Sequence, residues 1–255
     1  MRNFHSKLSL ALLVSAPLAA QAAHLGKCGD DFNGKSLGAE WTFLDKDGEP
    51  GGSAVVSGGK LTLTGKGSDV YGDVNEFVGV ALAPEAGNFD VSVKIESQDN
   101  TFEWAQAGIL AANDVNDLSK GGYVVVDVTP GNNYNAFYDS TGTVGTLDSH
   151  INAGVSGYPV WIRLARTGKK FSAWYKNKAD APWKVIAEGF ATQGTGPRSQ
   201  LALVSLSHND SLANKTVFDD FTCNKGPEPM SEHGPSPHKW VPWGFDAAGR
   251  HHAGY

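Results

Sequence analysis

Two charged residues interrupt strongly apolar stretches of this chain. Asp127 lies within YVVVDV, residues 123–128, and Arg163 lies within VWIRLA, residues 160–165. An unpaired charge in such surroundings is costly, because the neighbouring side chains cannot replace its hydration. The two residues therefore either pair with one another across neighbouring strands or line a face that binds a polar ligand. The sequence leaves both interpretations open.

Aromatic and amide side chains elsewhere in the chain could contribute to such a face. Aromatic rings stack on the C–H faces of sugar rings, planar polar groups hydrogen-bond to the hydroxyls, and most ligand sites combine apolar walls with a few polar anchors. The candidate binding residues are Tyr71, Trp104, Gln106, Tyr123, Asp127, Tyr134, Tyr138, Trp161 and Arg163. In the competing interpretation, the rings belong to the core and Asp127 and Arg163 form an internal ion pair.

Strands must position these residues. In residues 88–97, the apolar Phe89, Val91 and Val93 alternate with polar residues, which is the two-residue period of a half-buried strand. Similar segments follow at residues 59–65, 105–114, 121–130, 133–140, 158–167, 169–177, 183–190, 199–208 and 216–223. Turn-forming Gly, Pro and Asn residues separate them, including a turn predicted at residues 84–87. With no helical period, this pattern predicts an all-β protein, a two-sheet antiparallel sandwich or jelly roll.

Composition narrows the class of partner. The 255 residues carry a formal net charge of −6, and 40% of them are hydrophobic. An acidic chain is not attracted to nucleic acid or to an anionic membrane, so neither partner is expected. Beyond the N-terminal segment, no stretch is apolar enough to predict a membrane span.

The N-terminal segment reads as a signal peptide. Arg2 and Lys7 precede an apolar run from residue 8 to residue 18, and Ala20-Gln21-Ala22 then fits the small-x-small rule of signal peptidase. We expect cleavage after Ala22 and a secreted or periplasmic protein.

The two cysteines fit that location, because disulfides persist in oxidising compartments. Cys28 stands in GKCGDDFNG near the expected mature N-terminus, and Cys223 stands in the last predicted strand. A disulfide between them closes a loop holding nearly the whole domain, which the chain-entropy model values at about 4–5 kcal/mol. We therefore expect the first and last strands to lie side by side. The alternative is two free, buried cysteines.

The order of several segments resembles the concanavalin A-like lectin/glucanase superfamily, and most closely the DUF1349 group and the sandwich modules appended to bacterial glycosidases. The segments are DDFNGKSLGAEWTFL, SGGKLTLTG, NFDVSVKIE, EWAQAGILAAND, YPVWIRLARTGKKFSAWY, APWKVIAEGF and VFDDFTC, within residues 28–224. The resemblance implies the sandwich fold. It leaves function open, since this fold hosts lectins, glycanases, lyases and inert modules.

The resemblance also implies an ion. Similar sandwiches often hold a structural Ca²⁺ where the first and last strands meet, and Asp30, Asp31, Asp219 and Asp220 fall at that junction. Alternation lets one member of each pair face a common site, and we favour Asp31 with Asp219. The alternative is that these carboxylates cap turns and protect strand edges.

The catalytic pattern of glycanases on this fold, Glu-x-Asp-x-x-Glu, is absent. Glu96 and Asp99 are three residues apart, so an extended chain points them to opposite faces, and Glu103 stands alone. Gln106 lacks the His two residues later that the alginate-lyase type carries. An enzyme would need an unfamiliar arrangement around Glu103, Asp127 and Arg163, so we expect a protein that is not catalytic.

These observations divide the chain into a signal peptide at residues 1–22, a sandwich at 23–224 and a Pro- and His-rich tail at 225–255. The expected function is recognition of a polysaccharide or glycoconjugate on the concave sheet. The alternatives are a glycan hydrolase or lyase with an atypical site, and an envelope interaction protein. We expect the tail to dock on the sandwich or on a protein partner through Trp240, Trp243 and Phe245. The alternative, given equal weight, is a disordered tail.

Overall fold

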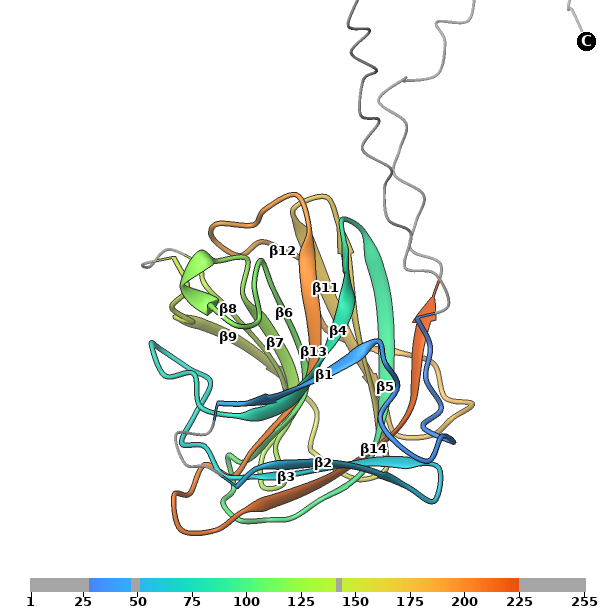
Figure 1. Cartoon of the computed structure of the whole chain (residues 1–255). Helices are drawn as coiled ribbons and strands as arrows, with labels where there is room; N and C mark the ends of the chain where they lie inside the picture. The colour runs from blue at the N-terminus through green and yellow to red at the C-terminus, as the bar shows by residue number, and fades with distance from the viewer. Residues whose placement is uncertain (1–27, 47–50, 141–143, 225–255) are drawn as a thin grey trace, which may run out of the picture.

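The computed structural model describes residues 28–46, 51–140 and 144–224, and these form two antiparallel sheets packed face to face (Figure 1). This confirms the predicted all-β sandwich. The predicted signal peptide and tail lie outside the described residues. Among the described residues, no helix is long and apolar enough to cross a membrane.

Each sheet has seven described strands. Sheet I has the order β1 (Trp41–Asp45), β4 (Val78–Ala86), β13 (Ser199–Leu206), β6 (Gln106–Ala112), β7 (Val124–Val128), β8 (Tyr134–Tyr138), β9 (Ser149–Ala153). Sheet II has the order β12 (Lys184–Phe190), β11 (Lys170–Lys176), β10 (Val160–Thr167), β5 (Phe89–Gln98), β14 (Asn214–Asn224), β3 (Lys60–Gly65), β2 (Ser53–Ser57). The one short helix described is the 3₁₀ turn η1 (Leu118–Lys120).

The alternation read from the sequence places the core between the sheets. Val91, Val93 and Ile95 of β5 are completely buried, and Ile109 of β6 and Val126 of β7 face them from sheet I. Removing each such side chain from water stabilises the fold by about 1.5–3 kcal/mol.

The turn predicted at residues 84–87 lies later in the chain, at Gly87 and Asn88. Strand β4 continues through Pro84 to Ala86, because it pairs with β13 up to the partners Ala86 and Ser199. Tertiary pairing therefore overrides the local preference of proline for a turn.

A second apolar cluster lies on the outer face of sheet I. Its members come from the strands and from three loops, residues 66–77, 113–123 and 144–148, and include Val70, Leu110, Tyr123, Val125 and Phe137. Two backbone hydrogen bonds of 2.9 Å between Gly72 and Leu147 tie two of these loops together. The chain's own loops thus cover much of this face, while the outer face of sheet II has no such cluster among the described residues.

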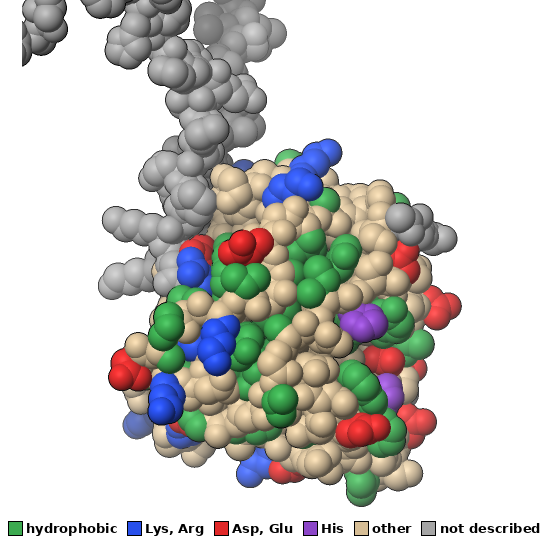
Figure 2. All heavy atoms as spheres, turned by 180° about the vertical axis from the view of Figure 1, so that it is seen from behind, with side chains coloured by type: hydrophobic (Ala, Val, Ile, Leu, Met, Phe, Trp, Pro, Cys, Tyr) green, Lys and Arg blue, Asp and Glu red, His purple; other side chains and the backbone are tan. Residues whose placement is uncertain are grey.

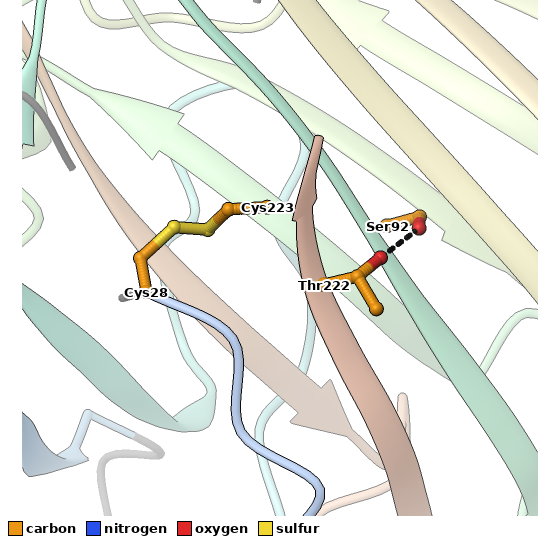
Figure 3. Close-up of a disulfide and its surroundings, with 4 residues drawn as sticks. All are labelled: Cys28, Ser92, Thr222 and Cys223. Atoms are coloured by element: carbon orange, nitrogen blue, oxygen red, sulfur yellow. Dashed lines mark hydrogen bonds between the residues drawn. A yellow bond between two sulfur atoms is a disulfide. The ribbon is translucent and has the colours of Figure 1, made fainter. Parts of the chain in front are cut away.

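The predicted disulfide is confirmed. Cys28 is bonded to Cys223 of β14, with Cα atoms 5.7 Å apart and a sequence separation of 195 (Figure 3). In the same view Thr222 and Ser92 share a hydrogen bond of 2.7 Å that ties β14 to β5.

The expectation that the first strand lies beside the last is only partly correct. The segment at Cys28 meets β14 through a single bridge between Asp30 and Phe221, whereas the first full strand, β1, pairs with β4 in the other sheet. Only the short segment ahead of β1 is tied to β14.

Candidate functional site

The structure separates the two charges that the sequence singled out. Asp127 lies on β7 of sheet I and Arg163 on β10 of sheet II. The interpretation that they form an ion pair is therefore wrong, and so is the interpretation that they line one binding face. Arg163 instead donates from Nε to Asp90 Oδ1 at 2.7 Å and from its second nitrogen to Oδ2, whereas Asp127 accepts from Asn135.

Asp127 belongs to a row of side chains that crosses the outer face of sheet I. Register places Gly108, Asp127, Asn135 and Asn152 opposite one another on β6, β7, β8 and β9. Asp127 and Asn135 are buried, with 0% and 1% of their surface exposed, whereas Asn152 at the sheet edge is exposed. The row thus leads from the surface into the covered part of the face.

Asp127 is a neutral acid rather than an anion at physiological pH. Burial is the main cause, and the charge of Asp69 adds to it, so the pKa of Asp127 rises to about 8 although Asn135 Nδ2 donates to its Oδ1 at 2.8 Å. A buried carboxyl prefers the uncharged form when its single hydrogen bond cannot repay lost hydration.

Gln106, two residues before Gly108 on the same face of β6, is buried beside a partly exposed entrance formed by Asp69, His208 and Phe102. Gln106 Nε2 donates to Asp69 Oδ1 at 3.1 Å, and His208 Nδ1 lies 3.9 Å from the same oxygen. The His208 and Phe102 rings are 4.9 Å apart, and 43% of the Phe102 surface is exposed. Burial raises the pKa of Asp69, and His208 and two hydrogen bonds oppose this.

Four buried oxygens in this region lack a hydrogen-bond partner among the described residues. They are Gln106 Oε1, Tyr123 Oη, Asp127 Oδ2 and Asn135 Oδ1. Buried polar groups in native proteins are almost always satisfied, so a cluster of exceptions indicates a place for water or for a ligand. Together with Asp69 and His208, these four residues are called the polar site below.

The remaining aromatic candidates are divided between surface and core. Trp104 is 37% exposed in the turn that precedes β6, and Tyr71 packs with its ring 5.5 Å from Phe137 in the outer cluster. Tyr134 stacks on Tyr175 at 4.0 Å between the sheets, and Tyr138 packs against the same core. Tyr134 and Tyr138 therefore belong to the core, as the competing interpretation predicted, rather than to a binding face.

Sequence reasoning missed three members of the polar site. The alternation of β8 could have identified Asn135, because it lies on the face of the strand opposite to Tyr134. Asp69 comes from the loop after β3 and His208 from the loop after β13. No spacing in the sequence connects these two loop residues.

Trp161 and Arg163 lie on the outer face of sheet II, away from the polar site. The Arg163 guanidinium lies 4.7 Å from the centre of the Trp174 ring and 5.7 Å from that of Trp183. Lys94 and Lys176 lie 5.2 and 5.6 Å from the Trp161 ring. These distances are typical of cation–π contacts.

The two aspartates proposed for calcium have different surroundings. Asp219 Oδ2 is 3.2 Å from Lys60 Nζ and 3.9 Å from Lys94 Nζ. Asp31 instead borders a shallow hollow with Asp30 and Asp220. No group of three or more His, Cys, Asp or Glu side chains suited to a metal occurs in the part of the chain that the structure describes.

The carboxylates weighed for catalysis do not share a site. Glu96 pairs with Lys60 and Lys94 on the outer face of sheet II, whereas Glu103 is exposed in the turn before β6. Because Arg163 is also on sheet II, an active site combining Glu103, Asp127 and Arg163 is excluded by the topology.

Comparison with known proteins supports the architecture. No family model matches the chain, and no curated protein matches it. Solved structures do match. A functionally unknown protein from Saccharomyces cerevisiae has 13% identity and a TM-score of 0.54, covering 74% of this chain and 97% of that one.

Two glycoside-degrading enzymes are similar in fold. A xylan β-1,4-xylosidase from Bacillus halodurans has 15% identity and a TM-score of 0.55 over 76% of this chain, but this chain spans only 39% of that enzyme. A non-specific endo-β-1,3(4)-glucanase of family GH16 has 12% identity and a TM-score of 0.53, covering 77% of this chain and 89% of that one. At these identities the comparisons show that the chain has the sandwich fold of the concanavalin A-like type.

Proposed function

We propose that this protein binds a carbohydrate at the polar site on the outer face of sheet I. The observation that carries the proposal is the cluster of four unpartnered buried oxygens, on Gln106, Tyr123, Asp127 and Asn135. The proposal also draws on the enzymes of similar fold, whose described substrates are xylan and β-1,3(4)-glucan.

The chemistry of the polar site suits sugar hydroxyls. A hydroxyl is both a donor and an acceptor, and a protonated Asp127, a tyrosine and two amides offer both kinds of group without a net charge. Phe102 and Trp104, exposed at the entrance end of β6, supply aromatic surface for the C–H face of a sugar.

The number of carboxyl groups on β7 favours binding of a carbohydrate without its cleavage. Glycoside hydrolysis normally uses two carboxyls that flank the bond, one as acid and one as nucleophile or base. The outward positions of β7 and the residue before it are Tyr123, Val125 and Asp127, so this strand brings a single carboxyl to the face. Asp69, another acid of the polar site, already accepts hydrogen bonds from Gln106 and from the backbone N–H of Val70.

A pull-down with soluble xylan and a β-1,3-glucan tests the proposal. We expect retention of the wild type and about tenfold weaker retention of Asn135→Ala, because this change removes an amide that would hydrogen-bond to the sugar. The matched control is Asn116→Ala in an exposed loop, which should bind as the wild type does. Absence of retention on both polysaccharides, or equal retention of Asn135→Ala, contradicts the proposal.

The same panel separates binding from catalysis. A non-catalytic protein leaves the polysaccharides intact after prolonged incubation, so no new reducing ends form. Release of reducing ends that is lost in Asp127→Asn would instead establish the hydrolase alternative.

Export, the relationship to DUF1349-type domains, docking of the tail on a protein partner and a structural calcium ion near Asp31 and Asp219 belong to this proposal as predictions. Mass spectrometry of the exported protein checks cleavage after Ala22. Thermal melting with and without EDTA checks calcium, since a bound ion that stabilises the folded state raises the Tm.

A further inference from the structure

The segment that forms β10, β11 and β12 of sheet II has a charge opposite to that of the whole chain. Residues 160–190, which form β10, β11 and β12, contain seven of the 21 basic residues and two of the 27 acidic residues, whereas the whole chain carries −6. Arg166 is buried and Arg163 is paired with Asp90, which leaves lysines as the available cations. These are Lys169, Lys170, Lys176, Lys178 and Lys184.

Three of the seven tryptophans lie on the same segment, at Trp161, Trp174 and Trp183. Trp161 stands between Lys94 of β5 and Lys176 of β11 in the strand register, and Trp174 is directly opposite Arg163. All three rings are partly exposed, and no loop cluster covers them among the described residues. We call this surface the tryptophan face.

Lys176 is the central cation of the tryptophan face. Its Nζ lies 4.9 Å from the centre of the Trp183 ring and 5.6 Å from that of Trp161, and it donates to the backbone oxygen of Ala179 at 2.6 Å. No carboxylate forms an ion pair with it among the described residues, in contrast to Lys94, which is held by Glu96 at 2.8 Å. Two of its three N–H donors are therefore available to an anion.

We propose that the tryptophan face binds an acidic polysaccharide, a chain of sugars that carry carboxylates. The flat indole rings suit the C–H faces of successive sugars, and the lysines along β11 and β12 suit their carboxylates. This surface is on the opposite sheet from the polar site, so the inference goes beyond the proposed function and does not depend on it. Figure 2 shows the molecule from behind, with basic side chains mostly toward the left and the top of the described surface and with hydrophobic and acidic side chains among them.

The arginines favour carboxylated sugars over nucleic acid as the occupant. Phosphate recognition commonly uses free guanidinium forks. Both forks here are engaged internally, Arg163 by Asp90 and Arg166 by Ser199 and two backbone oxygens.

Affinity electrophoresis with polygalacturonate tests the proposal on the full chain. We expect retardation of the wild type that weakens with added salt, and little retardation by fully methyl-esterified polygalacturonate, which has the same sugar without the charge. Lys176→Gln should weaken binding about fivefold and Trp183→Ala about tenfold. Lys35→Gln, at an exposed lysine in another segment, matches the charge change of Lys176→Gln and should bind as the wild type does.

Each other outcome overturns the inference. Equal binding of the esterified polymer removes the role of charge, and equal or tighter binding of single-stranded DNA assigns the surface to another class of partner. Equal binding by Lys176→Gln, Trp183→Ala and the wild type places the binding elsewhere. Asn135→Ala at the polar site should leave polygalacturonate binding unchanged, so failure here is distinguishable from failure of the proposed function.

Discussion

At the scale of single residues, burial and hydrogen-bond partners together determine the charge state of a side chain. Asp127 and Arg163 look equivalent in the sequence, since each interrupts an apolar strand. In the structure Arg163 stays charged, because Asp90 accepts from it through both carboxylate oxygens. Asp127 has one amide donor and no exposed surface, and is therefore held neutral at physiological pH by its raised pKa.

The raised pKa of Asp127 predicts a pH-dependent stability. In the unfolded chain this carboxyl loses its proton near 3.8, and in the folded chain near 8. Between these two pH values the folded state therefore holds one more proton than the unfolded state. The stability that this proton confers is complete below the pKa of the unfolded chain, and it is lost as the pH rises through the pKa of the folded chain. We expect the free energy of unfolding to fall by up to about 1.4 kcal/mol per pH unit in this window.

The Asp127→Asn variant isolates this effect, because an amide of nearly the same shape does not titrate. Urea unfolding between pH 5 and pH 8 should show a decline in the wild type that is absent or much smaller in the variant. Parallel pH profiles for the two proteins would show that Asp127 is ionised in the folded state.

At the scale of elements, the spacing of β6 and β7 sets the floor of the polar site. Gly108 lies opposite Asp127, and a Cβ at this position would be 2.1 Å from the backbone oxygen of Val126 and 2.9 Å from Asp127 Cβ. No side chain fits without a backbone shift. The glycine thus allows β7 to hold Asp127 against its neighbour.

Gly108→Ala should therefore destabilise the protein by about 2–4 kcal/mol, as overpacking against backbone cannot relax through a rotamer change. Gly157→Ala is the control, since the nearest atom to its added Cβ would be 3.9 Å away. Urea titration of the two variants gives the comparison. Equal midpoints would mean that the sheet absorbs the methyl group freely.

At the scale of the whole molecule, the disulfide joins the two ends of the described sandwich. With a sequence separation of 195 between Cys28 and Cys223, the bond restricts nearly the whole sandwich in the unfolded state. It also anchors the segment whose Asp30 accepts from the Trp41 indole at 2.9 Å and bridges to Phe221. The bond acts on the whole domain rather than on one hairpin.

Replacing both cysteines by alanine should cost about 4–5 kcal/mol and lower the Tm by roughly 10–20 °C. The wild type under reducing conditions should melt at the same temperature as the double variant. A double variant that melts with the oxidised wild type would show that the closed loop contributes nothing.

The sequence by itself determined the strands with strong alternation, such as β5 and β10, because the two-residue period of side chains is a local property of the chain. It also determined the sandwich class and the pairing of the only two cysteines in the chain. The sequence predicts a turn at Pro84 that does not form there, because the pairing of β4 with β13 outweighs the local preference of proline for a turn.

Only the tertiary structure decided which candidate residues share a surface. Strands β7 and β10 have similar patterns, yet sheet order sends Asp127 to one face of the molecule and Arg163 to the other. Alternation assigns each side chain to one of two sides of its own strand, but it does not say which sheet the strand joins or which loops fold over it. The partnership of Asp69 with Gln106 and His208 depends on two loops far apart in the sequence, so long-range packing alone creates the polar site.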